Sequence, residues 1–271
     1  MKNTFAIVAL LLLATAATAQ KKKLVWSEEF NYTGLPDSNK WGYEHGFIRN
    51  KEKQYYTIAR KENAFVHDGV LEIKAIKEAY ANAFYQPGSG DWKTADSTAQ
   101  YTSACIVSEG KAWWKYGRIE VRAKLPRGLG VWPAIWMMGI NRPQYGWPIC
   151  GEIDIMEFVG NDSSHVYGTI HYAKEDGINH SSSGGKIQVK KPYDDFHTYA
   201  LEWNRNDIRI FFDDILYHTF KTGNAGVKSG NPFKRPFYLM LNLALGGTWA
   251  GTIDDSNLPQ SFLVDYVRVY K

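Results

Sequence analysis

Cysteine is scarce in this chain, with only Cys105 and Cys150 among 271 residues. The cysteine and histidine residues are not clustered, so nothing near either thiol suggests a zinc site. Export would permit a disulfide, but the sequence cannot place the two thiols within bonding distance. We expect free thiols rather than a bridge.

A strong charge of one sign is also missing. The formal net charge is +4, and Lys21 to Lys23 supply much of it. No basic stripe runs along the chain, so the composition does not favour a nucleic acid as partner.

The longest apolar run, from Phe5 to Leu13, is too short to span a bilayer. It follows a basic start and precedes Ala17-Thr18-Ala19, which matches a small-x-small cleavage site. This pattern predicts a signal peptide over residues 1–19, cut after Ala19, and a secreted or periplasmic protein. No cysteine follows the run, so lipoprotein processing is not indicated.

Residues 20–271 lack a long amphipathic helix and any short repeat, and we expect one catalytic domain there. Ile119, Val121 and Ala123 alternate with charged residues, as in a strand with one buried face. Residues 196–220 predict a hairpin with its turn at 204–207. Many strands with regular turns indicate an all-β sandwich of two antiparallel sheets.

Two stretches rich in Gly, Ser and Asp, roughly 85–100 and 173–186, predict long loops. Such loops are either binding rims or tolerated insertions. Aromatic residues make up 15% of the chain, including 10 Trp. Large rings stack on sugar faces, but most of these rings are expected to fill the core.

Residues 151–157, Gly-Glu-Ile-Asp-Ile-Met-Glu, place three carboxylates inside one short apolar stretch that predicts a buried strand. Because strand side chains alternate, Glu152 and Asp154 share a face and Glu157 points away. A bulge in the two residues before Glu157 would return it to the acidic face. Buried acids on one face push their pKa values apart, which suits acid and nucleophile roles. The alternative is a surface strand with scattered acids.

The surrounding segment GEIDIMEFVG resembles the active-site signature of glycoside hydrolase family 16, in its laminarinase-like branch. The resemblance covers nearly the whole chain after the first two dozen residues. Further segments agree in order, among them WSEEF (26–30), NKEKQYYT (50–57), DGVLEIKA (68–75), YTSACIVSEGK (101–111), GVWPAIWMMG (130–139), YGTIHY (167–172), LNLALGGTWAG (241–251) and VDYVRVYK (264–271).

The resemblance implies a β-jelly-roll fold with a concave substrate cleft and retaining endo-glycosidase chemistry. It assigns Glu152 as nucleophile, Glu157 as general acid/base, and Asp154 as support for the nucleophile. Retention needs two carboxyl groups about 5–5.5 Å apart, one attacking the anomeric carbon and one protonating the leaving oxygen. We expect Glu152 ionised and Glu157 protonated at rest, with Asp154 hydrogen-bonded to Glu152.

Two tryptophans four residues apart, Trp132 and Trp136, share a strand face and could floor a sugar groove. Packing between the sheets is the alternative, and the resemblance favours the cleft for Trp132. Further residues for which the sequence leaves a substrate-binding or a purely structural role open are Asn50, Trp147, His171 and Asn242. For His171 we expect a hydrogen bond to Glu157 or to a sugar hydroxyl.

The resemblance also implies a structural calcium on the convex side, with Glu29, Gly69 and Asp265 at the matching positions. The first two would offer mostly backbone carbonyl oxygens, and calcium wants six or more oxygen ligands, so water must supply the rest. An ordinary surface acid is the alternative for Asp265. No cofactor is expected to be required for catalysis.

These observations together predict a secreted, monomeric, retaining endo-β-glucanase acting on β-1,3-glucan or mixed-linkage β-1,3-1,4-glucan. The expected partner is the polysaccharide alone, with no nucleic acid and no membrane span. The alternatives are a non-catalytic sugar-binding protein, a transglycosylase, and a hydrolase of another β-linked polysaccharide, since one fold hosts several substrates.

Overall fold

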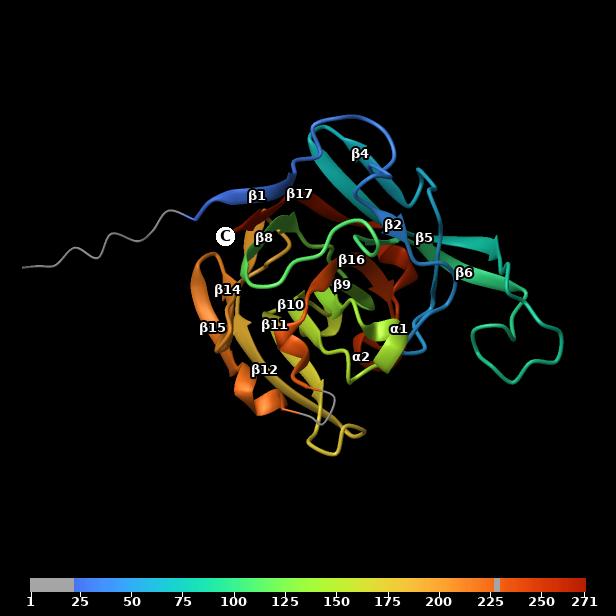
Figure 1. The fold of residues 1–271 in the computed structure, drawn as a ribbon. Coiled ribbons are helices and arrows are strands. Elements are labelled where there is room, and N and C mark those ends of the chain that lie inside the picture. Colours follow the sequence, from blue (N-terminus) through green and yellow to red (C-terminus); the bar gives the residue numbers. More distant parts are fainter. Residues whose placement is uncertain (1–21, 227–229) are drawn as a thin grey trace, which may run out of the picture.

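A computed structural model describes residues 22–226 and 230–271 (Figure 1). The signal peptide predicted over residues 1–19 lies outside the described residues, and its boundary with the domain stays a prediction. Among the described residues, no helix has the length and apolar character needed to cross a membrane.

The larger sheet has ten strands. Along its main path the order is β15 (Ile215–Lys221), β14 (Asp207–Phe212), β13 (His197–Trp203), β8 (Gly117–Lys124), β17 (Gln260–Tyr270), β5 (Val70–Ala81), β6 (Thr98–Ser103) and β3 (Gln54–Tyr56). Two strands pair outside this path: β1 (Leu24–Glu28) with β17, and β4 (Ala64–His67) with β5. The β3–β6 pair is parallel and the other pairs are antiparallel.

The second sheet has seven antiparallel strands, in the order β12 (His180–Gln188), β11 (His165–Ala173), β10 (Glu152–Glu157), β9 (Val131–Gly139), β16 (Phe237–Leu245), β7 (Cys105–Val107) and β2 (Gly42–Tyr43). The helices in the described parts are short: α1 (Arg142–Tyr145), α2 (Gly247–Ala250), and the 3₁₀ turns η1 (Gly160–Asp162), η2 (Thr222–Ala225), η3 (Pro232–Lys234) and η4 (Asp255–Asn257). The predicted all-β sandwich is therefore confirmed.

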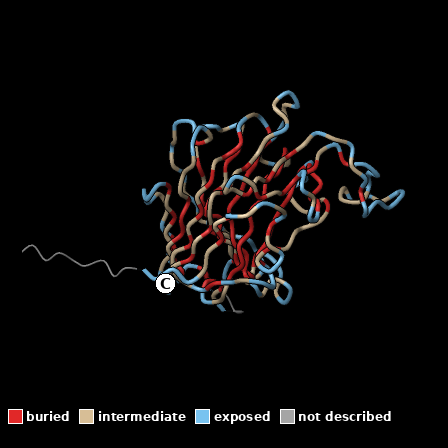
Figure 2. Tube along the Cα trace, turned by 90° about the horizontal axis from the view of Figure 1, so that it is seen from above, coloured by how far each residue is buried: buried red, intermediate tan, exposed pale blue. Residues whose placement is uncertain are grey.

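The hydrophobic core fills the space between the sheets, and Figure 2 shows the buried residues gathered there, with exposed residues at the turns. On β8 the expected alternation holds, since Ile119, Val121 and Ala123 are fully buried. Strand β9 is buried along its whole length. Its Ile135 and Met137 belong to the core between the sheets, whereas Trp136 belongs to a second apolar cluster on the other face.

Two predicted boundaries were wrong. The segment 196–220 is a three-stranded meander, because Asp213 and Asp214 take left-handed φ values of 45° and 64° and turn the chain between β14 and β15. The loop predicted over 173–186 is mostly strand, because β12 pairs with β11 along nine residues. The first predicted loop, 85–100, agrees better, since residues 82–97 lie between β5 and β6.

Both cysteines are buried free thiols, as expected. They belong to the apolar cluster beneath the open face of the seven-stranded sheet. The Cys150 thiol lies 3.4 Å from the Met138 sulfur, so it packs as a small apolar group.

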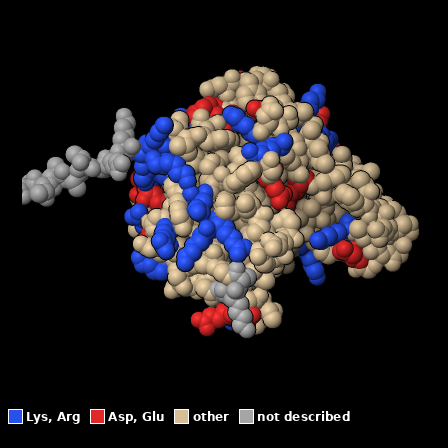
Figure 3. Space-filling view, in the orientation of Figure 1, with Lys and Arg blue, Asp and Glu red and all other residues tan. Residues whose placement is uncertain are grey.

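Lysines and arginines gather on the side of the molecule nearest the C-terminus (Figure 3). There the backbones of Lys23 and Lys271 pair, and the Lys271 amine donates a hydrogen bond to the Lys115 carbonyl. The lysines near the two chain ends therefore supply part of the small positive net charge.

Candidate active site

Strand β10 carries the bulge that the sequence analysis required. Asp154 pairs with Trp136 of β9, and Glu157 pairs with Ala134 of β9. The chain therefore advances three residues on β10 where it advances two on β9. The register shifts at the same place in the β10–β11 ladder. The extra residue returns Glu157 to the face of Glu152 and Asp154.

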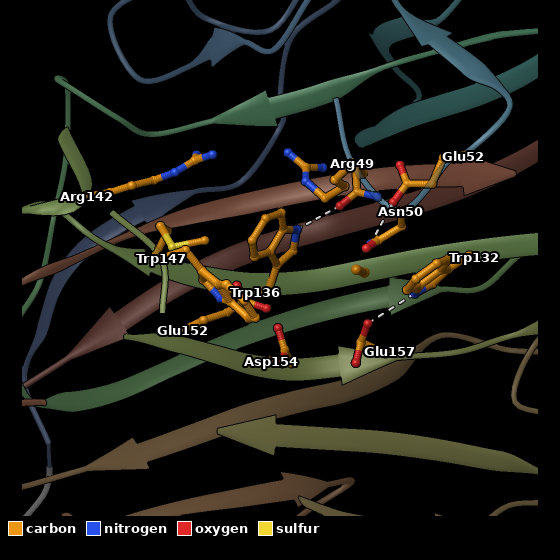
Figure 4. A pocket seen from close by; sticks show the side chains of 13 residues that line it. Arg49, Asn50, Glu52, Trp132, Trp136, Arg142, Trp147, Glu152, Asp154 and Glu157 are labelled. Atoms are coloured by element: carbon orange, nitrogen blue, oxygen red, sulfur yellow. Dashed lines mark hydrogen bonds between the residues drawn. The ribbon is translucent and has the colours of Figure 1, made fainter. Parts of the chain in front are cut away.

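All three carboxylates line one open cavity of about 260 Å³ (Figure 4). Five of the six predicted substrate-binding residues also line it: Asn50, Trp132, Trp136, Trp147 and Asn242. The sixth, His171, is not among the lining residues. The sequence analysis missed several others, namely Arg49, Glu52, Ala134, Met138 and Arg142.

His171 contacts Asp154 rather than Glu157, which corrects the expected hydrogen bond. On β11 it lies opposite Glu152, and its Nε2 is 3.1 Å from Asp154 Oδ2. Its other ring nitrogen, Nδ1, is 2.8 Å from Nε2 of His180. Ligand atoms of Glu152, Asp154 and His171 all lie within 4.8 Å of one another, close enough to share protons or hold a cation.

Trp132 holds Glu157 in place. The indole Nε1 donates a hydrogen bond of 3.1 Å to Glu157 Oε1, and the ring packs edge-on against Trp249 of α2. Trp132 is 8% exposed, so little of its side chain is accessible from the cleft. Trp132 lines the cavity, as expected of a residue of the cleft, and its hydrogen bond positions the Glu157 carboxyl group.

Trp136 also faces the cleft, but one face of its ring is already covered. The guanidinium of Arg49 lies 4.9 Å from the ring centre, and Arg49 also pairs with Glu44. The indole Nε1 donates to Asn242 Oδ1 at 2.7 Å, and Asn242 Nδ2 donates to Tyr56 Oη at 3.0 Å. Asn242 therefore positions Trp136, which weakens its predicted role as a direct sugar contact.

A second group of polar side chains reaches the cleft from residues 49–54. Asn50 donates to Glu52 Oε1 at 3.1 Å, and Gln54 donates to Glu52 Oε2 at 2.7 Å. Glu52 is 3% exposed, and burial raises its pKa. Glu52 belongs to the family-like segment NKEKQYYT (50–57), so the family resemblance could have identified it as a residue of the cleft.

At the opposite end of the cleft, Trp147 is 47% exposed, with its ring centre 4.8 Å from that of His180. This exposure fits a loop platform rather than a packed ring. Arg142, the first residue of α1, lies beside Trp147. No local sequence pattern predicted that α1 would reach the cleft.

Burial dominates the electrostatics of the acidic strand. It raises the pKa of Glu152 to about 8, with a further increase from the Asp154 charge and a decrease from His171 and Arg49. Burial likewise raises the pKa of Asp154. The pKa of Glu157 lies well above its usual value, through burial and then the charges of Asp154 and Glu152.

The raised pKa of Glu157 favours its protonated form, which the acid role requires. The raised pKa of Glu152 differs from the expected ionised state, because desolvation and a neighbouring acid both oppose its charge. The three carboxyls titrate as a coupled group. Because the pKa of each is raised, the resting cleft binds more protons than the same three carboxyls would in water.

The predicted calcium ligands lie on β17 or directly beside β1 and β5, which pair with β17. Strand β17 pairs with β1 at Val267–Glu28 and with β5 at Val264–Leu71, which brings Glu29, Asp265 and Gly69 toward one another. Both acids are already paired, Glu29 with Arg268 and Asp265 Oδ2 with Arg122. Two carbonyls and the remaining Asp265 oxygen are hard ligands that suit calcium, but the arginines offset the acidic charge.

Comparison with known proteins adds independent information. The model of the family "Glycosyl hydrolases family 16" matches residues 51–268. A beta-glucanase from Rhodothermus marinus is 45% identical over 261 residues, which cover 92% of this chain and 85% of that protein. Two other curated relatives are longer, and the chain spans 38% and 58% of their lengths.

Two solved structures are similar over most of this chain. The laminarinase from Rhodothermus marinus gives a TM-score of 0.80 at 45% identity, covering 92% of this chain and 97% of that one. A structure described under endo-acting O-glycanases of the human gut microbiota that initiate mucin breakdown gives a TM-score of 0.87 at 38% identity, covering 92% and 91%.

Proposed function

Since the chain belongs to glycosyl hydrolase family 16, we propose that it cleaves internal bonds of β-1,3-glucan or mixed-linkage β-1,3-1,4-glucan with retention of anomeric configuration. The observation that carries this proposal is the bulge in β10, which sets Glu152, Asp154 and Glu157 on one face of one cavity. The names of the relatives, a beta-glucanase and a laminarinase, support the substrate class.

The reaction proceeds in two displacements. An oxygen of ionised Glu152 attacks the anomeric carbon, the glycosidic C–O bond breaks, and Glu157 gives its proton to the leaving oxygen. Glu157, now ionised, takes a proton from water while the water oxygen attacks the anomeric carbon. The ester bond to Glu152 then breaks, and both carboxyls return to their first states.

The surrounding residues prepare this chemistry. Asp154 lies between the two glutamates, and its charge raises the pKa of both. The Trp132 indole holds the Glu157 carboxyl through Nε1. Binding substrate expels water from the cleft, which strengthens these electrostatic interactions.

The stereochemistry of the first product tests the mechanism. Proton NMR of the early digest should show the β-anomer first, because two inversions restore the starting configuration. Early appearance of the α-anomer would reject the double displacement. Glu152→Ser should abolish hydrolysis while polysaccharide binding stays measurable, and a binding protein without activity would show no hydrolysis in the parent either.

The substrate is tested by comparing laminarin, mixed-linkage glucan and cellulose with a mucin-type O-glycan. We expect turnover of at least one of the first two and none of the O-glycan. Products longer than the starting oligosaccharide would indicate transglycosylation instead of hydrolysis.

The proposal includes export and a monomeric enzyme. The basic start, short apolar run and Ala17-Thr18-Ala19 site support removal of residues 1–19. Mass spectrometry of the protein expressed in a bacterial host should find an N-terminus at Gln20 outside the cytoplasm, and light scattering should give the mass of one chain.

A further inference from the structure

Residues 82–97 form an arm that leaves the body between β5 and β6 (Figure 1). Asn82 holds its base: the side-chain amide donates to the carbonyls of Lys93 and Asp96, at 3.0 and 2.9 Å, and its Oδ1 accepts from the Phe84 backbone. Further backbone bonds close the arm, including Gln86 N–H to the Thr94 carbonyl at 2.9 Å. The arm thus has a defined conformation rather than that of a loose insertion.

This arm exposes aromatic rings. Phe84 is 47% exposed and Tyr85 is 42% exposed, although large rings are favourable to bury. The Phe84 ring packs against His45 at 4.9 Å and over Gly46, where a Cβ would lie 3.0 Å from the ring. Gly46 also has a φ of 93°, so glycine allows both the turn and this close contact.

Between the arm and the body lies a second cavity of about 400 Å³. It combines aromatic rings with polar and charged side chains, and its lining residues are Phe47, Ala83, Phe84, Tyr85, Gln86, Asp91, Lys93 and Thr94. Rings beside a few polar groups are the usual lining of a small-molecule or sugar site. The two charged residues of the second cavity, Asp91 and Lys93, have opposite signs, so the lining carries no net formal charge, which suits a neutral glycan.

Some residues that line the second cavity and the catalytic cleft are close together in the sequence. Phe47 lines the second cavity, and Arg49 and Asn50, two and three residues later, line the cleft. Neighbouring residues of β3 support the two sites: Tyr55 Oη accepts from the Ala83 backbone in the arm, and Tyr56 Oη accepts from Asn242 in the cleft. Residues 47–50 and β3 therefore link the arm to the catalytic cleft.

We propose that the arm and the 45–47 segment form a second glycan-binding surface, which holds a neutral β-glucan chain while the cleft cleaves it. This proposal rests on the proposed function for the identity of the glycan. The rings of Phe84 and Tyr85 supply the apolar contact, and the polar side chains supply hydrogen bonds to hydroxyl groups. A short oligosaccharide fills the cleft alone and gains nothing from the arm.

The test compares long and short substrates. In a Glu152→Ser background, which prevents turnover, Phe84→Ala/Tyr85→Ala should weaken binding to long laminarin and to insoluble β-1,3-glucan about tenfold. In the active background the same pair should leave kcat/KM on a laminari-oligosaccharide unchanged, which also shows that the variant folds.

Trp113→Ala is the matched control, because Trp113 is 51% exposed but lines neither cavity. It should bind long glucan as the parent does. Equal binding of the arm variants and the parent would overturn the proposal, as would an equal loss in Trp113→Ala. If the parent hydrolyses another β-linked polysaccharide, the proposed substrate alone fails, and the same comparison on that polysaccharide decides the role of the arm.

Discussion

Nε2 of His171 lies 3.1 Å from Oδ2 of Asp154, and no other side chain among the described residues pairs with that buried oxygen. His171 lowers the pKa of Glu152. We therefore predict that His171→Ala raises the pKa of the nucleophile and moves the acidic limb of the kcat/KM profile upward by about one pH unit. Initial rates between pH 4 and 10 check this shift.

His180→Ala is the control for this prediction. His180 contacts His171 through Nε2 and is separated from the acids by His171. Its loss should therefore move the acidic limb of the kcat/KM profile in the same direction but by less. A His171→Ala enzyme with reduced kcat and an unmoved acidic limb would contradict the electrostatic account.

Trp132→Phe should move the opposite limb. The indole donates to the Glu157 carboxyl and so favours its ionised form, which lowers its pKa. Without that bond the acid keeps its proton to higher pH, and the basic limb of kcat/KM should shift upward while kcat falls, because the carboxyl is less well held. Trp113→Ala should leave the profile unchanged, and a downward shift in Trp132→Phe would refute the prediction.

Glu157→Gln should stabilise the protein at alkaline pH. Burial raises the pKa of Glu157 above its unfolded value, so the folded state binds more protons and loses stability as pH rises from the unfolded toward the folded pKa. A glutamine carries no charge to desolvate. We expect its Tm to exceed that of the parent by at least about 3 °C at pH 8.

At pH 4 the advantage should vanish, since Glu157 is then largely protonated in both states. Calorimetry at the two pH values gives the comparison, with the surface substitution Glu175→Gln as control. Equal Tm values at pH 8 would mean that Glu157 is ionised in the folded protein without cost.

Calcium should bind weakly at the predicted site of Glu29, Gly69 and Asp265. The charge of Asp265 is offset by Arg122, so we expect affinity near the millimolar range found for extracellular sites. Millimolar calcium chloride should raise Tm relative to excess EDTA, and Asp265→Asn should lose that increase without losing activity. Calcium-independent melting of the parent would remove the predicted site.

Much of the cleft could be predicted because its reactive groups are local in sequence. Spacing placed Glu152 and Asp154 on one face and showed that Glu157 needed a bulge, which β10 has. Spacing also placed Trp132 and Trp136 on one strand face, and the family resemblance favoured the cleft for Trp132. Predicted loop boundaries failed where a Ser- and Gly-rich stretch forms the edge strand β12, since pairing with β11 outweighs the weak strand preference of these residues.

The alternating strands and the three acids could be predicted from the sequence because each is a pattern within a few residues, and the family because matching segments follow in order along the chain. The residues that surround the acids became known only from the folded structure. Asn242 contacts Trp136 across 106 residues and Tyr56 across 186, and Arg49 and Arg142 reach the cleft from segments far apart in the sequence. Strand period is a local property of the backbone, whereas these contacts depend on how two sheets pack, which no short stretch encodes.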